Sequence, residues 1–270
     1  MAAPKVEAVT KPLILGEGPH WDQDEKVLYF VDLPGSTVNK YDPVTKKHTS
    51  TSKIDGGNVT FVLPIKGKKD KFAIAIERDL AIMTWNGEDG PPQNIERLLT
   101  IENEPGKSGN RFNDAKCDPN GRLWAGTMGP ELGPGEIPPH AGAFYSISKN
   151  LEVKTHITEV GISNGLAWSK DLEYFYYVDS HITKVFRYKF NSTTGEIYPE
   201  TGNLLQSVCI PAPNVTSVAF GGSNLDELYV TTASIRMTPE QEKKYPTAGA
   251  VFKVTGLGVK GYPGVSVDLN

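Results

Sequence analysis

The sequence has few cysteines, no long apolar run and no surplus of basic residues, and each shortage excludes a class of protein. Its 270 residues include only two cysteines, Cys117 and Cys209. They are too few for a disulfide framework and lack the CxxC spacing of a zinc site, so we expect both to be small buried residues. The formal net charge of −4 leaves nothing to neutralise a phosphate backbone, so nucleic acid is not an expected partner.

Signals for membranes and secretion are missing as well. No stretch of 18 or more apolar residues occurs, and residues 1–15 lack the basic segment, apolar core and cleavage site of a signal peptide. We therefore expect a cytoplasmic protein without a membrane partner. Helical periodicity is nearly absent too. The exception is residues 238–245, where Thr238 as N-cap and Pro239 at the first helical position predict one short helix.

Short strands fill most of the chain. Between its 27 glycines and 20 prolines the sequence holds short runs rich in β-branched and aromatic residues, such as VLYFVD, KFAIAI and ELYVTT. Runs of this kind, bounded by Gly, Asp, Asn and Pro, are typical of strands in antiparallel hairpins. The sequence therefore predicts an all-β protein.

These strands repeat. Five times, a strand is followed by a polar turn and a second strand. The first strands of these units end at Trp21, Pro64, Cys117, Trp168 and Phe220, at spacings of 43 to 53 residues. A period of about 40 to 50 residues with several antiparallel strands indicates a β-propeller, whose blades stack around a central channel. We expect one propeller domain over residues 1–270, with about five blade repeats.

Three tryptophans fit this arrangement. We expect Trp21, Trp124 and Trp168 to occupy matching strand positions and to form core between blades. None is expected to bind a ligand.

The register of the repeats places five polar residues at one mouth of the channel. The residues four positions before each strand end all carry side-chain oxygens, and they are Glu17, Thr60, Asn113, Asn164 and Thr216. One carboxylate and two carboxamides without sulfur or imidazole suit a hard cation such as Ca²⁺ or Mg²⁺, whereas zinc more typically recruits His or Cys. Glu17 is therefore predicted to be a metal ligand and not a turn residue. Arg111, two residues before Asn113, should point into the same mouth and bind an oxygen-rich substrate.

Several motifs together resemble a known family. They are GEGPHW (16–21), NRFNDAKCDPNGRLWAGTM (110–128), SNGLAWS (163–169), YYVDS (176–180), FGGSNLDELYVT (220–231) and VTGLGVKG (254–261). With them the chain resembles the regucalcin (senescence marker protein) and gluconolactonase family, and within it the insect members, including the luciferin-regenerating enzymes.

The resemblance implies a fold, an activity and a site. It implies a six-bladed β-propeller that hydrolyses sugar lactones with a divalent metal at the top of the channel. Ca²⁺ is the first candidate, and Zn²⁺, Mn²⁺ or Mg²⁺ are alternatives. By motif, Glu17 and Asn164 match the metal ligands, and Arg111 and Asn113 match the substrate-binding residues.

One family feature is missing from the chain. Members carry a further repeat that opens with Pro-Asp-Gly, whose aspartate is the third metal ligand and the usual candidate for the general base. Here residues 193–214 join the two flanking blades directly, and no Pro-Asp-Gly occurs. The catalytic base is therefore unassigned. Asp114 follows Asn113 and by strand alternation should face away, while Asp179 lies on a later strand, so neither is an expected replacement.

Two questions follow from this loss. The five blades either close on themselves, which we expect, or keep six-blade curvature and leave a gap. The activity is predicted to be metal-dependent lactone hydrolysis, and the alternatives are a non-catalytic calcium-binding regulatory protein and a propeller used only as an interaction scaffold. The Gly/Pro-rich segment 132–142 is a candidate lid over the channel. The oligomeric state is left open.

Overall fold

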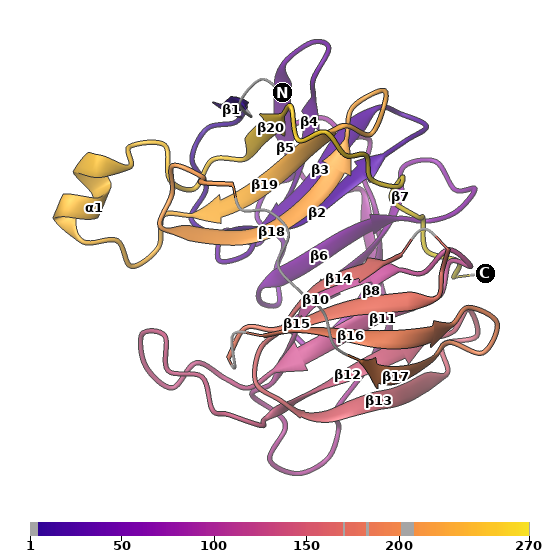
Figure 1. The fold of residues 1–270 in the computed structure, drawn as a ribbon. Coiled ribbons are helices and arrows are strands. Elements are labelled where there is room, and N and C mark those ends of the chain that lie inside the picture. The colour runs from indigo at the N-terminus through magenta and orange to yellow at the C-terminus, as the bar shows by residue number, and fades with distance from the viewer. Residues whose placement is uncertain (1–4, 170, 182–183, 201–207, 270) are drawn as a thin grey trace.

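The computed structural model describes residues 5–169, 171–181, 184–200 and 208–269. These residues form five four-stranded antiparallel sheets arranged as the blades of a β-propeller (Figure 1). The all-β prediction and the five repeats are confirmed. Of the segment that joins the last two repeats, residues 201–207 lie outside the described part.

The strands follow the chain blade by blade. Blade 1 holds β2 (Gly16–Asp22), β3 (Val27–Asp32), β4 (Thr37–Asp42) and β5 (Lys47–Ser50), and blade 2 holds β6 (Val59–Pro64), β7 (Lys71–Ile76), β8 (Asp79–Thr84) and β9 (Asn94–Thr100). Blade 3 holds β10 (Arg111–Cys117), β11 (Leu123–Met128), β12 (Gly142–Ile147) and β13 (Val153–Val160), and blade 4 holds β14 (Ser163–Trp168), β15 (Tyr174–Asp179), β16 (Lys184–Asn191) and β17 (Glu196–Glu200). Blade 5 holds β18 (Asn214–Gly221), β19 (Glu227–Ala233), β20 (Phe252–Thr255) and β1 (Lys5–Ala8). Each blade begins with one of the five strands that set the register of the repeats.

Blade 5 joins the two ends of the chain. Its outermost strand is β1, which pairs antiparallel with β20 from Lys5 opposite Thr255 to Ala8 opposite Phe252. An N-terminal strand that completes the last sheet ties the first and last segments of the chain together by backbone hydrogen bonds, which is how a ring of blades is held. Blades 5 and 1 are therefore firmly joined.

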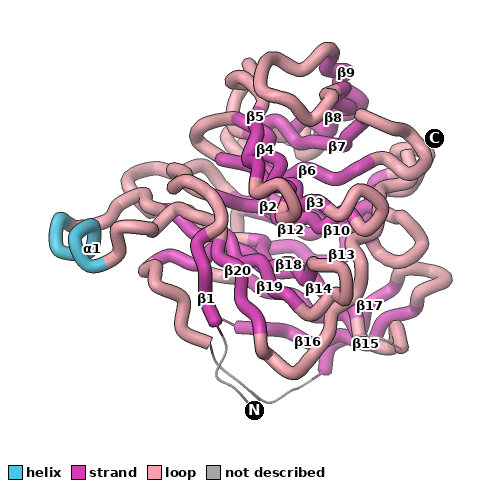
Figure 2. Tube along the Cα trace, turned by 90° about the horizontal axis from the view of Figure 1, so that it is seen from above, coloured by secondary structure: helices cyan, strands magenta, loops and turns pink. Residues whose placement is uncertain are grey.

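The only helix of the described residues lies outside the propeller. The predicted short helix is α1 (Pro239–Lys244), and Thr238 caps it in a capping box with Gln241. In both views α1 projects away from the sheets (Figures 1 and 2). No described helix is long and apolar enough to cross a membrane.

The blades pack through buried apolar side chains, with two departures from expectation among the tryptophans. Trp21 and Trp124 are buried as expected, and Trp21 stacks on Tyr229 with ring centroids 5.6 Å apart. Trp124, however, lies on β11, the second strand of its blade, and so does not match the position of Trp21. Trp168 packs beside Trp124 but is only half-buried, because one side of it faces a cavity.

The two cysteines differ from each other. Cys117 ends β10 and is buried, as predicted. Cys209 is exposed, which overturns the expectation that both are core residues. The reason is its position in the irregular segment that precedes β18, where no strand directs its side chain into a blade.

The junction between blades 4 and 5 is looser than the others. All residues of β6, and all but the last of β2, are buried. The corresponding strands β14 and β18 are partly exposed, and Val215 and Val218 of β18 are 51% and 43% exposed. The inner strands of blades 4 and 5 are thus more exposed than those of blades 1 and 2, and whether the ring closes fully here stays a prediction. By the family resemblance, the missing repeat would have stood at this junction.

The C-terminal segment crosses the end of the channel at which the inner strands finish. The backbone N–H of Gly261 donates to Leu225 O at 2.8 Å, and further along Val267 donates to Pro64 O and Asp268 to Gly121 O, both at 2.9 Å. These acceptors belong to blades 5, 2 and 3. The segment therefore covers the end opposite to the mouth where the candidate ligands lie.

Candidate functional site

Every inner strand carries a β-bulge near its start. The regular pairing with the second strand is interrupted once in each of β2, β6, β10, β14 and β18. A bulge adds one residue, bends the strand and re-aims a side chain, and bulges often accompany functional sites. The five bulges lie near the candidate ligands. Side chains there need not alternate between the two faces of the strand.

Two of these bulges explain why a glycine follows each predicted metal ligand. Gly18 after Glu17 and Gly165 after Asn164 have φ of 55° and 45°, in the left-handed region that favours glycine. A Cβ on Gly165 would also lie 2.7 Å from Val178 Cγ2. The glycine beside Glu17 is therefore required by the backbone that turns this carboxylate inward.

Glu17 is a buried carboxyl with little compensation. It is 9% exposed. Among the described residues it makes one hydrogen bond, which its Oε2 accepts from the backbone N–H of Gly18 at 3.3 Å. Burial raises the pKa of Glu17 to about 8; the charge of Asp114 adds to the rise, and the Gly18 bond and the Arg111 charge oppose it. At neutral pH, such a carboxyl is stable as an anion only when a positively charged group or ion binds beside it.

Three further predicted site residues form a hydrogen-bonded chain. Arg111 donates from Nη1 to Asn113 Oδ1 at 2.8 Å, and Asn113 donates from Nδ2 to Asn164 Oδ1 at 2.7 Å. Asn164 in turn donates to Ser180 Oγ at 2.8 Å. The chain fixes both amide orientations, because each nitrogen faces an acceptor. Blades 3 and 4 thus bring Arg111, Asn113 and Asn164 together.

Asp114 belongs to the same site, contrary to the expectation from strand alternation. The bulge of β10 falls between Phe112 and Ala115, so Asp114 does not follow the simple inward and outward order. It is 2% exposed, and its charge influences the pKa of Glu17. One oxygen accepts the N–H of Ala115 at 2.9 Å, while Oδ2 has no hydrogen-bond partner in the described part of the chain. Burial raises the pKa of Asp114.

Asp179 has a structural role. Its Oδ1 and Oδ2 accept the backbone N–H groups of Ile162 at 3.1 Å and Gly161 at 2.9 Å. Asp32 does the same in blade 1, where it accepts the backbone N–H groups of Ile14 and Leu15, just before β2. The aspartates that end the second strands in VLYFVD and YFYYVD therefore hold the start of the first strand. Because both oxygens of Asp179 are occupied in this way, we do not assign it as the missing base.

Thr216 and Thr60, the other two of the five polar residues predicted at the mouth, differ in their environment. Thr216 donates to the backbone oxygen of Gly16 and lies 2.8 Å from the hydroxyl of Thr231, so it links blade 5 to blade 1. Thr60 is 1% exposed, and its hydroxyl has no hydrogen-bond partner among the residues that the structure describes. An unpartnered buried hydroxyl in a channel is suited to a ligand or to water.

The donor set fits a hard divalent cation. It contains two buried carboxyls, two carboxamides and a hydroxyl. Two of its oxygens, Asp114 Oδ2 and Thr60 Oγ1, lack a hydrogen-bond partner within the described ranges. Oxygen donors of this kind suit Ca²⁺, Mg²⁺ or Mn²⁺. Among the described residues no three His, Cys, Asp or Glu side chains gather as a metal site. Amide oxygens and water would therefore complete the coordination.

Comparison with known proteins identifies the family. The sequence profile of the SMP-30/gluconolactonase/LRE-like region matches residues 15–201 and 196–234. The chain belongs to this family. Human regucalcin is 33% identical over 97% of this chain and 97% of its own length, and the Danio rerio protein is 33% identical over 97% and 98%. The resemblance seen in the motifs is confirmed.

Solved structures agree. A luciferin-regenerating enzyme is 38% identical and superposes with a TM-score of 0.90, over 99% of this chain and 100% of that chain. A gluconolactonase from Xanthomonas campestris superposes with a TM-score of 0.61 at 12% identity, over 93% of this chain and 89% of that one. At that identity the second likeness concerns the fold alone.

The comparisons also fit the loss of one repeat. The alignment with human regucalcin runs over 306 positions, whereas this chain has 270 residues. At least 36 positions of the alignment are therefore gaps in this chain. The two pieces of the profile match meet at residues 196–201. Both observations support a missing internal segment between blades 4 and 5, close to the loose junction.

The candidate lid lies at the mouth that holds these residues. Segment 132–142 follows β11, whose last residue, Met128, pairs with Arg111. Leu132 is 71% exposed, and the segment is anchored by an ion pair between Glu131 and Arg236 and by Leu132 N–H donating to Glu136 O at 2.9 Å. It is therefore an ordered hairpin near the entrance.

Deleting residues 133–139 tests the lid. We expect a higher KM for a lactone and an unchanged unfolding midpoint, because the deletion leaves the buried strands β11 and β12 intact. Initial rates at varied lactone concentration and a thermal melt measure the two quantities. An unchanged KM would show that the segment does not contribute to substrate binding.

Proposed function

We propose that this chain hydrolyses sugar lactones with a divalent cation held by Glu17 and Asn164. The observation that supports this most directly is the buried Glu17 carboxyl, which has no ion-pair partner among the described residues and whose pKa burial raises to about 8. Family membership supports the same activity, since the matching profile is that of gluconolactonases and related proteins. A cytoplasmic location and sugar lactones as partners stay predictions.

Each residue has a distinct task in this proposal. Arg111 and Asn113 bind and orient the substrate, because a guanidinium and an amide offer donors to hydroxyl and carbonyl oxygens. The bound cation would polarise the lactone carbonyl oxygen. Asp114 accepts a proton from the attacking water, since its Oδ2 lies in the same buried site without a hydrogen-bond partner among the described residues, and burial raises its pKa. It thus takes the task of the aspartate that the missing repeat would have supplied.

Hydrolysis of D-glucono-δ-lactone tests the proposal. Purified protein is assayed by the acid released, first with EDTA and then with Ca²⁺, Mg²⁺, Mn²⁺ or Zn²⁺. We expect turnover above the spontaneous rate only with a cation, Ca²⁺ being the first candidate. Equal rates with EDTA and with each cation, from protein that is folded by circular dichroism, would refute metal-dependent hydrolysis.

Replacing Arg111 tests the substrate assignment. Arg111→Met should raise KM more than it lowers kcat and reduce kcat/KM about 10- to 100-fold, the usual worth of a hydrogen bond to a charged group. Arg97→Met is a matched control, because Arg97 pairs with Asp79 on the outer strands of blade 2. Equal KM values for wild type and Arg111→Met would contradict the assignment.

A non-catalytic calcium-binding protein is the second candidate function. The observation in its favour is the absent Pro-Asp-Gly aspartate, which leaves the cation fewer carboxylates. Under this alternative Ca²⁺ binds at Glu17 but no lactone is turned over. Cation binding and lactone turnover, measured on one preparation, separate the two functions.

A further inference from the structure

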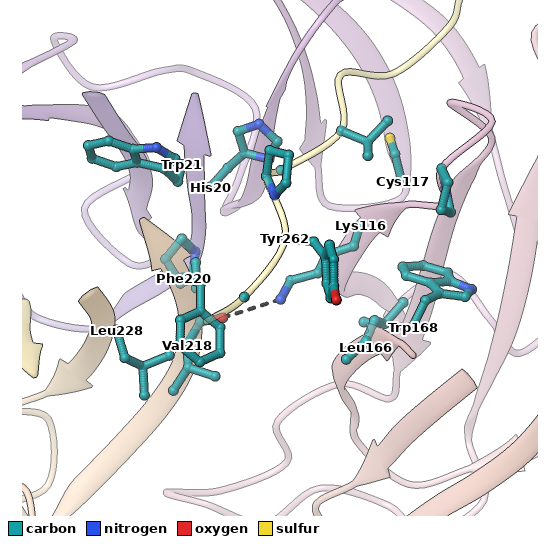
Figure 3. A pocket seen from close by; sticks show the side chains of 18 of the residues that line it. His20, Trp21, Lys116, Cys117, Leu166, Trp168, Val218, Phe220, Leu228 and Tyr262 are labelled. Carbon is teal, nitrogen blue, oxygen red and sulfur yellow. Dashed lines mark hydrogen bonds between the residues drawn. The ribbon is translucent and has the colours of Figure 1, made fainter. Parts of the chain in front are cut away.

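The cavity that Trp168 faces lies at the loose junction and is distinct from the mouth that holds Glu17. It has a volume of about 600 Å³, within the range of small-molecule sites. Leu166 and Trp168 line it from β14, Val218 and Phe220 from β18, and Tyr262 from the C-terminal segment (Figure 3). The cavity is thus bounded by the strands that the missing repeat would have separated.

The walls of this cavity are mostly apolar and its charges are of one sign. Two lysines, Lys116 and Lys260, are among the lining residues, and none of those residues is an aspartate or glutamate. His20 also lines it, but burial lowers the pKa of His20 to about 3, so this imidazole is neutral at physiological pH. The cavity therefore combines hydrophobic walls with a net positive charge.

Lys116 places its ammonium inside the cavity. Figure 3 shows its side chain extending between Val218 and Tyr262, with Nζ donating to the backbone oxygen of Val218 at 3.2 Å. An ammonium has three donors, and this is its one recorded hydrogen bond among the described residues. Burial lowers the pKa of Lys116, which the charge of Asp114 opposes.

The cavity lies further along the channel than the proposed cation site. His20 and Lys116 each follow a candidate mouth residue, Glu17 and Asn113, by three positions on the same strands. Three residues of fully extended chain span at most roughly 10 Å, and the bulges of β2 and β10 within these stretches shorten that distance. The C-terminal segment closes this end of the channel, and Gly264 lies against His20. The two sites are therefore separate.

We propose that this cavity binds a hydrophobic monocarboxylate, with the carboxylate on Lys116 and the aliphatic or aromatic part between the inner strands of blades 4 and 5. Lys116 is half-buried, and an ammonium beside apolar walls gains a charge-assisted hydrogen bond from an anion. The apolar walls exclude small hydrophilic anions as good ligands, since a sugar acid would lose hydration there without replacement partners. A ligand with one carboxylate and a hydrocarbon body satisfies both the charge and the walls.

Calorimetric titration with decanoate tests this inference. We expect saturable binding of one decanoate per chain in the presence of EDTA, so the result does not depend on the proposed lactonase activity. Lys116→Met removes the charge but keeps the length of the side chain, and should weaken binding about 10- to 100-fold. Lys149→Met, an exposed lysine in a turn of blade 3, is the matched control and should bind like wild type.

A second variant and a second probe keep the inference falsifiable. Val218→Asp adds a carboxylate to the cavity wall at a position that is 43% exposed, so the fold should tolerate it while decanoate binding falls at least about tenfold. Decyltrimethylammonium has the same chain length and opposite charge, and should bind at least about tenfold more weakly than decanoate. The inference is overturned by absent decanoate binding to wild type, by equal binding of the two probes, or by unchanged binding in both cavity variants.

Discussion

Glu17→Gln is expected to abolish cation binding and to make the metal-free protein less sensitive to pH. The folded pKa of Glu17 is raised to about 8 from 4.5, so between these values the folded protein holds a proton that the unfolded chain releases. The free energy of unfolding therefore falls as pH rises through this window. From pH 6 to 8 the Glu17 contribution falls by on the order of 2 kcal/mol, and glutamine removes it.

Denaturant unfolding in EDTA at several pH values measures this effect. Comparing wild type with Glu17→Gln removes the contributions of the other titrating groups, which both proteins share. Glu152→Gln alters an exposed glutamate in the turn before β13 and serves as the matched control, which should keep the wild-type slope. Parallel stability profiles for wild type and Glu17→Gln would show that Glu17 ionises normally, and would remove the main support for the cation site.

Asp114→Asn is expected to lower kcat for lactone hydrolysis by about 10² to 10⁴, the usual cost of losing a general base. The amide retains one oxygen to accept the N–H of Ala115, so the bulge of β10 should persist. Cation affinity should change much less than kcat. Initial rates and cation titration on the same preparation provide both numbers.

The matched control for this variant is Asp24→Asn. Asp24 is an exposed aspartate in the turn after β2, at the other end of the strand that carries Glu17. It should leave kcat unchanged. If Asp114→Asn retains the wild-type kcat, another group or water accepts the proton; if it loses cation binding as fully as Glu17→Gln, Asp114 is a ligand and not the base.

Much of the fold could be predicted from the sequence because the repeats are regular. The strand ends at Trp21, Cys117 and Phe220 lie in or at the end of β2, β10 and β18, and the polar residues four positions earlier lie near the start of those strands. The alternation of apolar and polar residues and the turn residues are local signals, and they were enough to predict the strand positions. The family followed from motifs spread along the chain.

Asp114 shows what local patterns could not provide. Alternation along a strand assigns Asn113 and Asp114 to opposite faces, but the bulge between Phe112 and Ala115 breaks that order. A bulge depends on the pairing partner in β11, which alternation within one strand does not contain. The glycines after Glu17 and Asn164 were the available signal, since Gly-containing inner strands often mark bulges.

The junction of blades 4 and 5 was the other feature beyond sequence reasoning. Whether five blades close tightly depends on how far every blade rotates against its neighbour, a sum over all the other interfaces. Those interfaces are well packed, and the exposed Val215 and Val218 reflect the resulting mismatch. The cavity at Lys116 lies at the same junction.

The most direct test of the proposed cation site is titration of Mn²⁺ into metal-free protein, followed by electron paramagnetic resonance of the free ion. We predict one bound Mn²⁺ per wild-type chain at pH 8, weaker binding at pH 6 because Glu17 must release a proton, and none in Glu17→Gln. Folded wild-type protein that leaves all Mn²⁺ free, or Glu17→Gln that binds as well as wild type, would contradict the claim that five blades retain the cation site.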